Sequence, residues 1–228
     1  MNALLFTGGE CPAEEEIRPW IRETDFIAAA DSGLATVDRL GLQPDLIVGD
    51  MDSLPDKRLP DKFPAAEIVR LNPAKDFSDT ESALRLLHPR GFSEIILIGG
   101  GGGRLDHVFA LVKLFDTPFC PSVWLAGSSA AFFLRPGETL RASGLAPGDT
   151  VSVFAAGRGP HRITGKNLRW SPDRLPWDSP DYTPGNSLSN WAETDCVEFS
   201  CRAGAFVCVF PQKQSLQAVR RRETDSAN

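Results

Sequence analysis

The sequence has few cysteines and no paired cysteine motif. Five cysteines are spread along the 228 residues, and no two of them form a Cys-x-x-Cys pair: Cys11, Cys120, Cys196, Cys201 and Cys208. An odd number of dispersed cysteines favours buried, reduced thiols over a disulfide framework. The N-terminus also lacks a basic segment followed by a long apolar run. Both absences favour a cytoplasmic protein.

An excess of positive charge and a long hydrophobic run are absent as well. The chain has 24 Lys and Arg against 30 Asp and Glu, a formal net charge of −6. The resulting field repels nucleic acid and anionic membranes, and no apolar window approaches the length of a membrane span. We therefore expect no nucleic-acid partner and no membrane association. Any anionic ligand must be held locally, by a metal ion, a glycine-rich loop or a single arginine.

The first half of the sequence alternates apolar runs with segments of helical spacing. The predicted strands are 2–9, 26–31, 45–50, 66–72, 94–100 and 122–127, and the predicted helices are 14–23, 33–41, 78–88 and 104–115. The strands are continuously apolar, which is typical of a parallel sheet covered on both faces. We predict a doubly wound, mostly parallel α/β domain over residues 1–128.

The second half has no long helical period and contains many turn signals. Its predicted strands are short: 139–143, 150–156, 161–170, 195–201 and 205–210. This pattern predicts an antiparallel β-sandwich domain over residues 129–218. We expect residues 125–138 to form the crossover between the domains and residues 219–228 to form a disordered polar tail.

Acidic residues follow several of the predicted strands. Asp31 ends the second strand, Asp50 and Asp52 end the third, and Asp76 and Asp79 follow the fourth. In an open parallel sheet, ligands bind outside the carboxyl ends of the strands, so these side chains should converge. Gathered carboxylates need a counter-charge, and oxygen ligands without Cys and with few His suit Mg²⁺.

A run of five glycines, 99–103, follows the fifth strand and directly precedes a predicted helix. Such a loop lets backbone N–H groups approach an anion closely at a helix N-terminus. Arg104 lies where it could clamp a phosphate bidentately, and Asp106 and His107 share that first turn. Together with the acidic residues, this loop predicts a metal–polyphosphate site.

Each part of this prediction has a simpler structural alternative. Asp31 and Asp79 could be helix caps, and the pair Asp50 and Asp52 could form a solvated turn. The glycine run could be a flexible loop, His107 a structural residue, and Glu81 part of a solvated helix face. The site is favoured because all the parts fall at one edge of one sheet.

The order of these segments resembles the thiamine pyrophosphokinase family. The matching stretches are "AADSG" (29–33), "PDLIVGDMDSL" (44–54), "KDFSDTESAL" (75–84), "GGRLDHVFA" (102–110), "RITGKNLRW" (162–170) and the "SN" at 189–190. The resemblance covers nearly the whole chain. It implies an α/β nucleotide-binding domain followed by a β-sandwich domain, as a homodimer. It also implies Mg²⁺-dependent transfer of pyrophosphate from ATP to thiamine, giving thiamine diphosphate and AMP.

The resemblance assigns roles by motif position. The metal and phosphates would be held by Asp50, Asp52, Asp79 and Asp106. Asp31 would belong to the same acidic cluster. The nucleotide would be bound by Asp31, Ser32, Gly33, Gly102, Gly103, Arg104, Asp106 and His107. Thiamine would meet Lys75, Trp170, Ser189 and Asn190, with Asp76 on the facing loop, although Trp170 could instead be a packing residue. Asp52 and Asp76 are the candidates for the group that takes the alcohol proton.

The chain departs from the family pattern at Ser32, Ser78, Ser187 and Leu188. These departures leave a pyrophosphokinase for another primary alcohol, such as a hydroxymethylpterin, as an alternative. A metal-dependent phosphohydrolase and a nucleotide-binding sensor without transfer activity are the alternatives from other functional classes.

Overall fold

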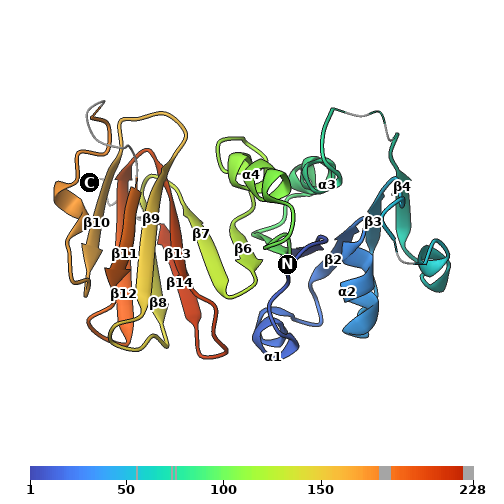
Figure 1. Cartoon of the computed structure of the whole chain (residues 1–228), viewed down its shortest axis with the longest axis horizontal. Helices are drawn as coiled ribbons and strands as arrows, with labels where there is room; N and C mark the ends of the chain where they lie inside the picture. Colours follow the sequence, from blue (N-terminus) through green and yellow to red (C-terminus); the bar gives the residue numbers. More distant parts are fainter. Residues whose placement is uncertain (55, 73, 75, 180–185, 223–228) are drawn as a thin grey trace, which may run out of the picture. The chain divides into compact units, whose positions relative to one another are not determined.

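The computed structural model describes residues 1–54, 56–72, 74, 76–179 and 186–222. The chain forms two compact units, Met1–Ser128 and Ser129–Asn228. The first contains all the α-helices of the described residues, and the second is built from strands and one short 3₁₀ turn (Figure 1).

The N-terminal unit is organised around a parallel sheet. Its strand order is β4-β3-β2-β1-β5-β6, and every pair is parallel. The strands are β1 (Ala3–Phe6), β2 (Phe26–Ala30), β3 (Leu46–Gly49), β4 (Glu67–Arg70), β5 (Ile95–Ile98) and β6 (Val123–Ala126). Most of the strand residues are buried, and only edge strand β4 is largely exposed. The predicted doubly wound sheet is confirmed, and its order reverses between β1 and β5.

Four α-helices accompany this sheet: α1 (Glu14–Ile17), α2 (Gly33–Arg39), α3 (Asp79–Leu87) and α4 (Leu105–Leu114). The helix predicted over 14–23 is short because Pro19 interrupts it, and the chain continues as a 3₁₀ turn. Helix α3 begins after Ser78, whose Oγ accepts a hydrogen bond from the Glu81 amide, as an N-cap serine does. Helix α2 packs on β1 and β2, and α3 packs on β1, β2 and β3.

The C-terminal unit contains two antiparallel arrays of four strands. One has the order β11-β9-β13-β7 and the other β10-β12-β8-β14. The strands are β7 (Ser129–Leu134), β8 (Glu138–Ser143), β9 (Thr150–Ala156), β10 (Arg162–Lys166), β11 (Asn186–Trp191), β12 (Cys196–Ala203), β13 (Ala205–Pro211) and β14 (Gln217–Arg222). The ring of Phe199 on β12 lies 6.1 Å from that of Phe210 on β13, so the arrays share an aromatic core. The predicted β-sandwich is confirmed.

Three strands depart from the sequence prediction. Residues 129–134, placed in a crossover, form β7 and pair with β13 over an apolar stretch. Residues 186–191 form β11, although their polar composition gave no strand signal. Residues 217–222 form edge strand β14 beside β8, so the polar tail predicted from 219 was wrong for 219–222. One-sided exposure explains the polar composition of β14, because an edge strand needs few apolar residues.

The five cysteines are free thiols. Burial raises the pKa of Cys201 to about 11 and raises the pKa of Cys208 further still. Among the described residues, no helix combines the length and the apolar character needed to cross a membrane.

Candidate active site

Three aspartates meet at the carboxyl edge of the parallel sheet. Asp31 follows β2, Asp50 follows β3, and Asp79 is the first residue of α3. One carboxylate oxygen from each lies within 4.8 Å of the others, and all three residues are partly exposed. The convergence predicted from the ends of neighbouring parallel strands is therefore present for these residues.

The backbone around Asp31 and Asp50 is adapted to this approach. Asp31 and Met51 adopt left-handed φ angles of 46° and 63°, a conformation uncommon for non-glycine residues. Gly49 allows the two strand ends to come together, since a Cβ there would lie 3.2 Å from the Asp31 Cα. The Asp31 amide donates to the Val48 carbonyl at 2.8 Å. Strained backbone of this kind gathers at functional sites.

The three carboxylates offer oxygen atoms of the kind that bind a cation. Asp31 Oδ1 is buried without a hydrogen-bond partner among the described residues, while its Oδ2 accepts from Ser53 Oγ. The pKa of Asp52 is raised, first by its hydrogen bond to Asp50 and then by the charge of Asp50. A buried oxygen without a donor, next to other carboxylates, fits a divalent ion with oxygen ligands.

The predicted acidic residues have different partners in the structure. Asp31, which was predicted to belong to the acidic cluster and was also counted with the nucleotide-binding residues, lies in the cluster. Asp106, which was assigned to the metal, pairs with Arg104 through Nη2–Oδ2 at 2.6 Å and Nε–Oδ1 at 3.2 Å, and this lowers the pKa of Asp106. Asp52 lies beside the cluster, exposed, and its amide donates to Asp50 Oδ1 at 3.1 Å.

The glycine-rich loop lies at the point where the strand order reverses. Gly99, Gly100, Gly102 and Gly103 have positive φ angles, and a Cβ at Gly99 would lie 2.4 Å from the Thr7 carbonyl oxygen. The amides of 99–101 donate to carbonyls of Leu125, Gly8 and Glu10. None of the described residues accepts a hydrogen bond from the Gly102 or Gly103 amide. These two amides are therefore available to an anion.

Sequence reasoning missed the residues that face this loop. Gly8, Gly9 and Glu10 follow β1, and Glu10 pairs with Gly101 in both directions, at 2.6 and 3.0 Å. The Glu10 carboxylate lies over the loop, since a Cβ at Gly102 would be 2.4 Å from its Oε2. The signal was the "GGE" after the first strand, at the edge where the other loops were placed.

The remaining predicted residues of this unit have different surroundings. Gly33 is required by packing, because a Cβ there would lie 2.2 Å from the Phe6 carbonyl oxygen. Ser32 lies over Gly8, and His107 is exposed in the first turn of α4. Asp76 is exposed three residues before Asp79, and Lys75 lies outside the described residues.

In the C-terminal unit, two tryptophans form an exposed aromatic pair. The rings of Trp170 and Trp191 lie 5.4 Å apart, and the residues are 54% and 48% exposed. Asn190 between them is buried: its Oδ1 accepts from the amides of Trp170 and Trp191, and its Nδ2 donates to the Trp170 carbonyl at 2.6 Å. Asn190 thus holds the pair in place, and its contact with the substrate stays a prediction. Ser189 is exposed with a φ of 54°.

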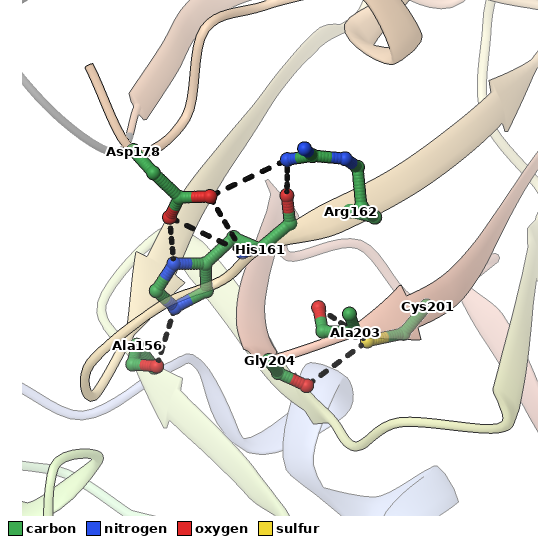
Figure 2. Close-up of polar contacts among 7 residues, drawn as sticks. All are labelled: Ala156, His161, Arg162, Asp178, Cys201, Ala203 and Gly204. Carbon is green, nitrogen blue, oxygen red and sulfur yellow. Dashed lines mark hydrogen bonds and ion pairs between the residues drawn. The ribbon is translucent and has the colours of Figure 1, made fainter.

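A buried histidine, His161, is held by polar contacts on both sides of its ring (Figure 2). His161 Nδ1 lies 2.8 Å from Asp178 Oδ1, and Nε2 lies 3.0 Å from the Ala156 carbonyl oxygen. Each ring nitrogen of His161 therefore has an oxygen partner. The His161 amide and ring lower the pKa of Asp178. This polar cluster has a structural role. It joins His161 to Asp178 and so closes the segment 161–178, which contains Trp170.

Comparison with known proteins identifies the N-terminal unit. Residues 17–119 match the family model described as "Thiamin pyrophosphokinase, catalytic domain", a match that includes the three clustered aspartates and the glycine-rich loop. Over these residues the chain is similar to the catalytic domain of the thiamin pyrophosphokinase family, as its sequence motifs predicted. The sequence prediction of an enzyme of this family is confirmed. A search of curated proteins finds no match.

Solved structures of the family share the fold of the whole chain. Thiamine pyrophosphokinase from Bacillus subtilis aligns with a TM-score of 0.73 and 16% identity, over 93% of this chain and 100% of its own. A thiamin pyrophosphokinase family protein from Enterococcus faecalis gives 0.69 and 21%, over 93% and 100%. Thiamin pyrophosphokinase from Candida albicans gives 0.65 and 18%, over 93% and 90%. At these identities, the likeness establishes the fold.

Proposed function

We propose that the chain transfers the pyrophosphoryl group of ATP to the hydroxyl of thiamine with the help of Mg²⁺, giving thiamine diphosphate and AMP. The observation that carries the proposal is the convergence of Asp31, Asp50 and Asp79 within 4.8 Å, next to a glycine loop with two available amides. The match of residues 17–119 to the thiamin pyrophosphokinase catalytic domain supports the same reaction.

The acidic cluster would hold the metal. Asp31, Asp50 and Asp79 offer three carboxylate oxygens, and the buried Asp31 Oδ1 needs a partner of positive charge. When bound, Mg²⁺ supplies charge neutralisation for a polyphosphate. The other two predicted metal ligands are Asp106, which forms an ion pair with Arg104 in this structure, and Asp52, which is exposed.

Phosphate binding falls to the glycine loop and Arg104. The Gly102 and Gly103 amides lack acceptors among the described residues, and the Arg104 side chain is 72% exposed at the start of α4. A phosphate could replace the Asp106 carboxylate on the guanidinium, because both anions match its fork. Most of the catalysis then consists of positioning an in-line attack. Asp52 and Asp76 stay the candidates for accepting the alcohol proton.

The thiamine ring would stack on the exposed tryptophan pair. Trp170 and Trp191 present aromatic faces to solvent, and a flat cation gains about 0.5–2 kcal/mol from such a face. The homodimer and the cytoplasmic location stay predictions; sedimentation velocity tests the first.

A direct assay tests the proposed reaction. The purified chain is incubated with ATP and Mg²⁺, with thiamine, with a hydroxymethylpterin, or with no acceptor, and AMP, phosphate and thiamine diphosphate are measured. We expect AMP and thiamine diphosphate to form in equal amounts, and only when thiamine is the acceptor. Adding EDTA to remove the metal should abolish both products. AMP formed only with the pterin would assign another alcohol. Phosphate release without an acceptor would assign a hydrolase, and nucleotide binding without turnover a sensor.

A further inference from the structure

Helix α3, which begins with Asp79 of the acidic cluster, carries an arginine that contacts two aromatic rings. The Arg85 Cζ on α3 lies 4.0 Å from the Phe77 ring centroid and 4.5 Å from that of Phe119. Phe77 is 45% exposed, although it is a large apolar residue on the segment that leads into α3. Both distances are well within the range of cation–π attraction. The stack therefore gives an otherwise exposed ring a defined place.

Glu81 joins this stack to the start of the helix. Its Oε1 accepts from Arg85 Nε at 3.0 Å and Nη2 at 2.8 Å, and its amide donates to Ser78 Oγ at 3.1 Å. The Glu81 side chain is only 21% exposed, so it is not the solvated helix face considered as an alternative. One residue thus connects the N-cap of α3 with the guanidinium.

The start of α3 is consequently held from two sides. On the inner side, the buried hydroxyls of Thr80 and Thr7 lie 2.7 Å apart and tie α3 to the end of β1. On the outer side, Phe77 is held by Arg85. Asp79, which belongs to the acidic cluster, lies between these two anchors in sequence, and Asp76 directly precedes Phe77.

We propose that Arg85 is a positioning residue that orders the segment 76–78 and thereby sets the Asp79 carboxylate for metal binding. This inference rests on the proposed function, because it assumes that the acidic cluster holds a divalent cation. In this proposal Arg85 acts through Phe77 and Glu81 and contacts neither the acidic cluster nor the substrate. Its guanidinium is needed because it contacts both rings while donating to Glu81 through both Nε and Nη2, a fork of donors that an ammonium lacks.

The chain contains a matched control for this arrangement. Arg90 Nη2 donates to Glu67 Oε2 at 2.8 Å, and its Cζ lies 5.3 Å from the Phe26 ring centroid. The two arginine side chains are similarly exposed, 31% for Arg90 and 37% for Arg85. Phe26 and Glu67 are the first residues of β2 and β4, at the opposite end of the sheet from the acidic cluster.

The test compares Arg85→Leu, Arg85→Lys and Arg90→Leu with the wild type. Amide hydrogen exchange of 76–82 is measured without metal, and Mn²⁺ binding to the protein alone is measured by electron paramagnetic resonance. We expect Arg85→Leu to accelerate exchange of the Glu81 amide and to weaken Mn²⁺ binding by about tenfold, the scale of losing one stacked cation. Arg85→Lys should lie between Arg85→Leu and the wild type, and Arg90→Leu should change neither quantity.

The two measurements separate the inference from the proposed function. Unchanged exchange in Arg85→Leu, or Mn²⁺ binding as tight as in the wild type, would overturn the positioning role. An equal loss of Mn²⁺ binding in Arg90→Leu would also overturn it, because the effect would then be general destabilisation. If the wild type bound no Mn²⁺, the metal site and the positioning of Asp79 for it would both fail. Accelerated exchange in Arg85→Leu would then still show that Arg85 orders the segment.

Discussion

The two units of the chain both contain paired carboxylates, such as Glu81 with Arg85 and Asp149 with Lys213, but they differ in net charge and in one cluster of acids. Residues 1–128 have 20 Asp and Glu against 12 Lys and Arg, a net charge of −8, whereas residues 129–228 have 10 against 12, a net charge of +2. In the C-terminal unit, Asp149 pairs with Lys213, Glu198 with Lys166, and Asp178 with His161 and Arg162. In the N-terminal unit, three carboxylates gather with one another.

The difference separates structural charges from charges kept for a ligand. A carboxylate that already has a cationic partner contributes to the folded state as it stands. Carboxylates that converge raise the energy of the ligand-free protein and lower it once a cation binds. The comparison therefore predicts opposite consequences when one acid from each unit is neutralised.

The largest effect is expected for Asp31→Asn. Asparagine tolerates the left-handed φ of 46° and removes one negative charge from the cluster, so unfolding by urea should be no easier than in the wild type. Thiamine-dependent AMP formation should fall by about two to three decades, the scale of losing one key electrostatic group. The control is Asp38→Asn, which breaks a surface pair with Lys62. Near-normal activity of Asp31→Asn would remove the metal role of the cluster.

The next effect is expected for Asn190→Ala in the C-terminal unit. The amide of Asn190 makes three hydrogen bonds to the backbone of Trp170 and Trp191, and the residue is 3% exposed. Leaving these backbone groups unpaired should lower the free energy of unfolding by about 2–3 kcal/mol. Urea denaturation measures the loss, with the exposed amide Gln214→Ala as control. Equal midpoints for the two variants would contradict the proposed anchoring role.

The sequence was most informative where strands are buried on both faces. Continuous apolar runs such as 46–49 and 95–98 predicted the parallel sheet, and its geometry then placed Asp31, Asp50 and Asp79 at one edge. Strands with one exposed face gave weaker signals. For that reason β11 and β14, which are polar and lie at edges, were not predicted.

The sequence did not predict which side chains pair with one another. The pattern "GRLDH" places Arg104 and Asp106 two residues apart, and nothing in that spacing shows that the aspartate pairs with the arginine. Likewise, "SN" did not reveal that Asn190 turns inward to two tryptophans. Direction within a turn depends on left-handed backbone at residues such as Asp31 and Ser189, which the tertiary structure imposes.

A smaller effect is expected for the aromatic pair. Trp170→Leu and Trp191→Leu remove one exposed ring each from the 5.4 Å pair while leaving the Asn190 contacts to the backbone. The KM for thiamine should rise by up to about tenfold in each, with kcat and the KM for ATP nearly unchanged. Val219→Ala, an exposed apolar residue on β14, is the control. A loss confined to kcat would instead place the tryptophans in the chemical step.

The smallest effect is expected for the acid dependence of Asp178. Its pKa is lowered in the folded protein by the His161 amide and ring, so its contribution to stability is present above the ordinary carboxyl pKa. That contribution is lost as the pH falls through the lowered value, because a protonated acid accepts less strongly from the His161 amide and ring than a carboxylate does. The urea midpoint of the wild type should therefore fall more steeply below about pH 4 than that of Asp178→Asn. Asp178→Asn should keep its activity at neutral pH, in contrast to Asp31→Asn, because Asp178 pairs with His161 and Arg162 and is not part of the acidic cluster. Parallel acid limbs for wild type and Asp178→Asn would show that the pair in Figure 2 adds nothing to folding.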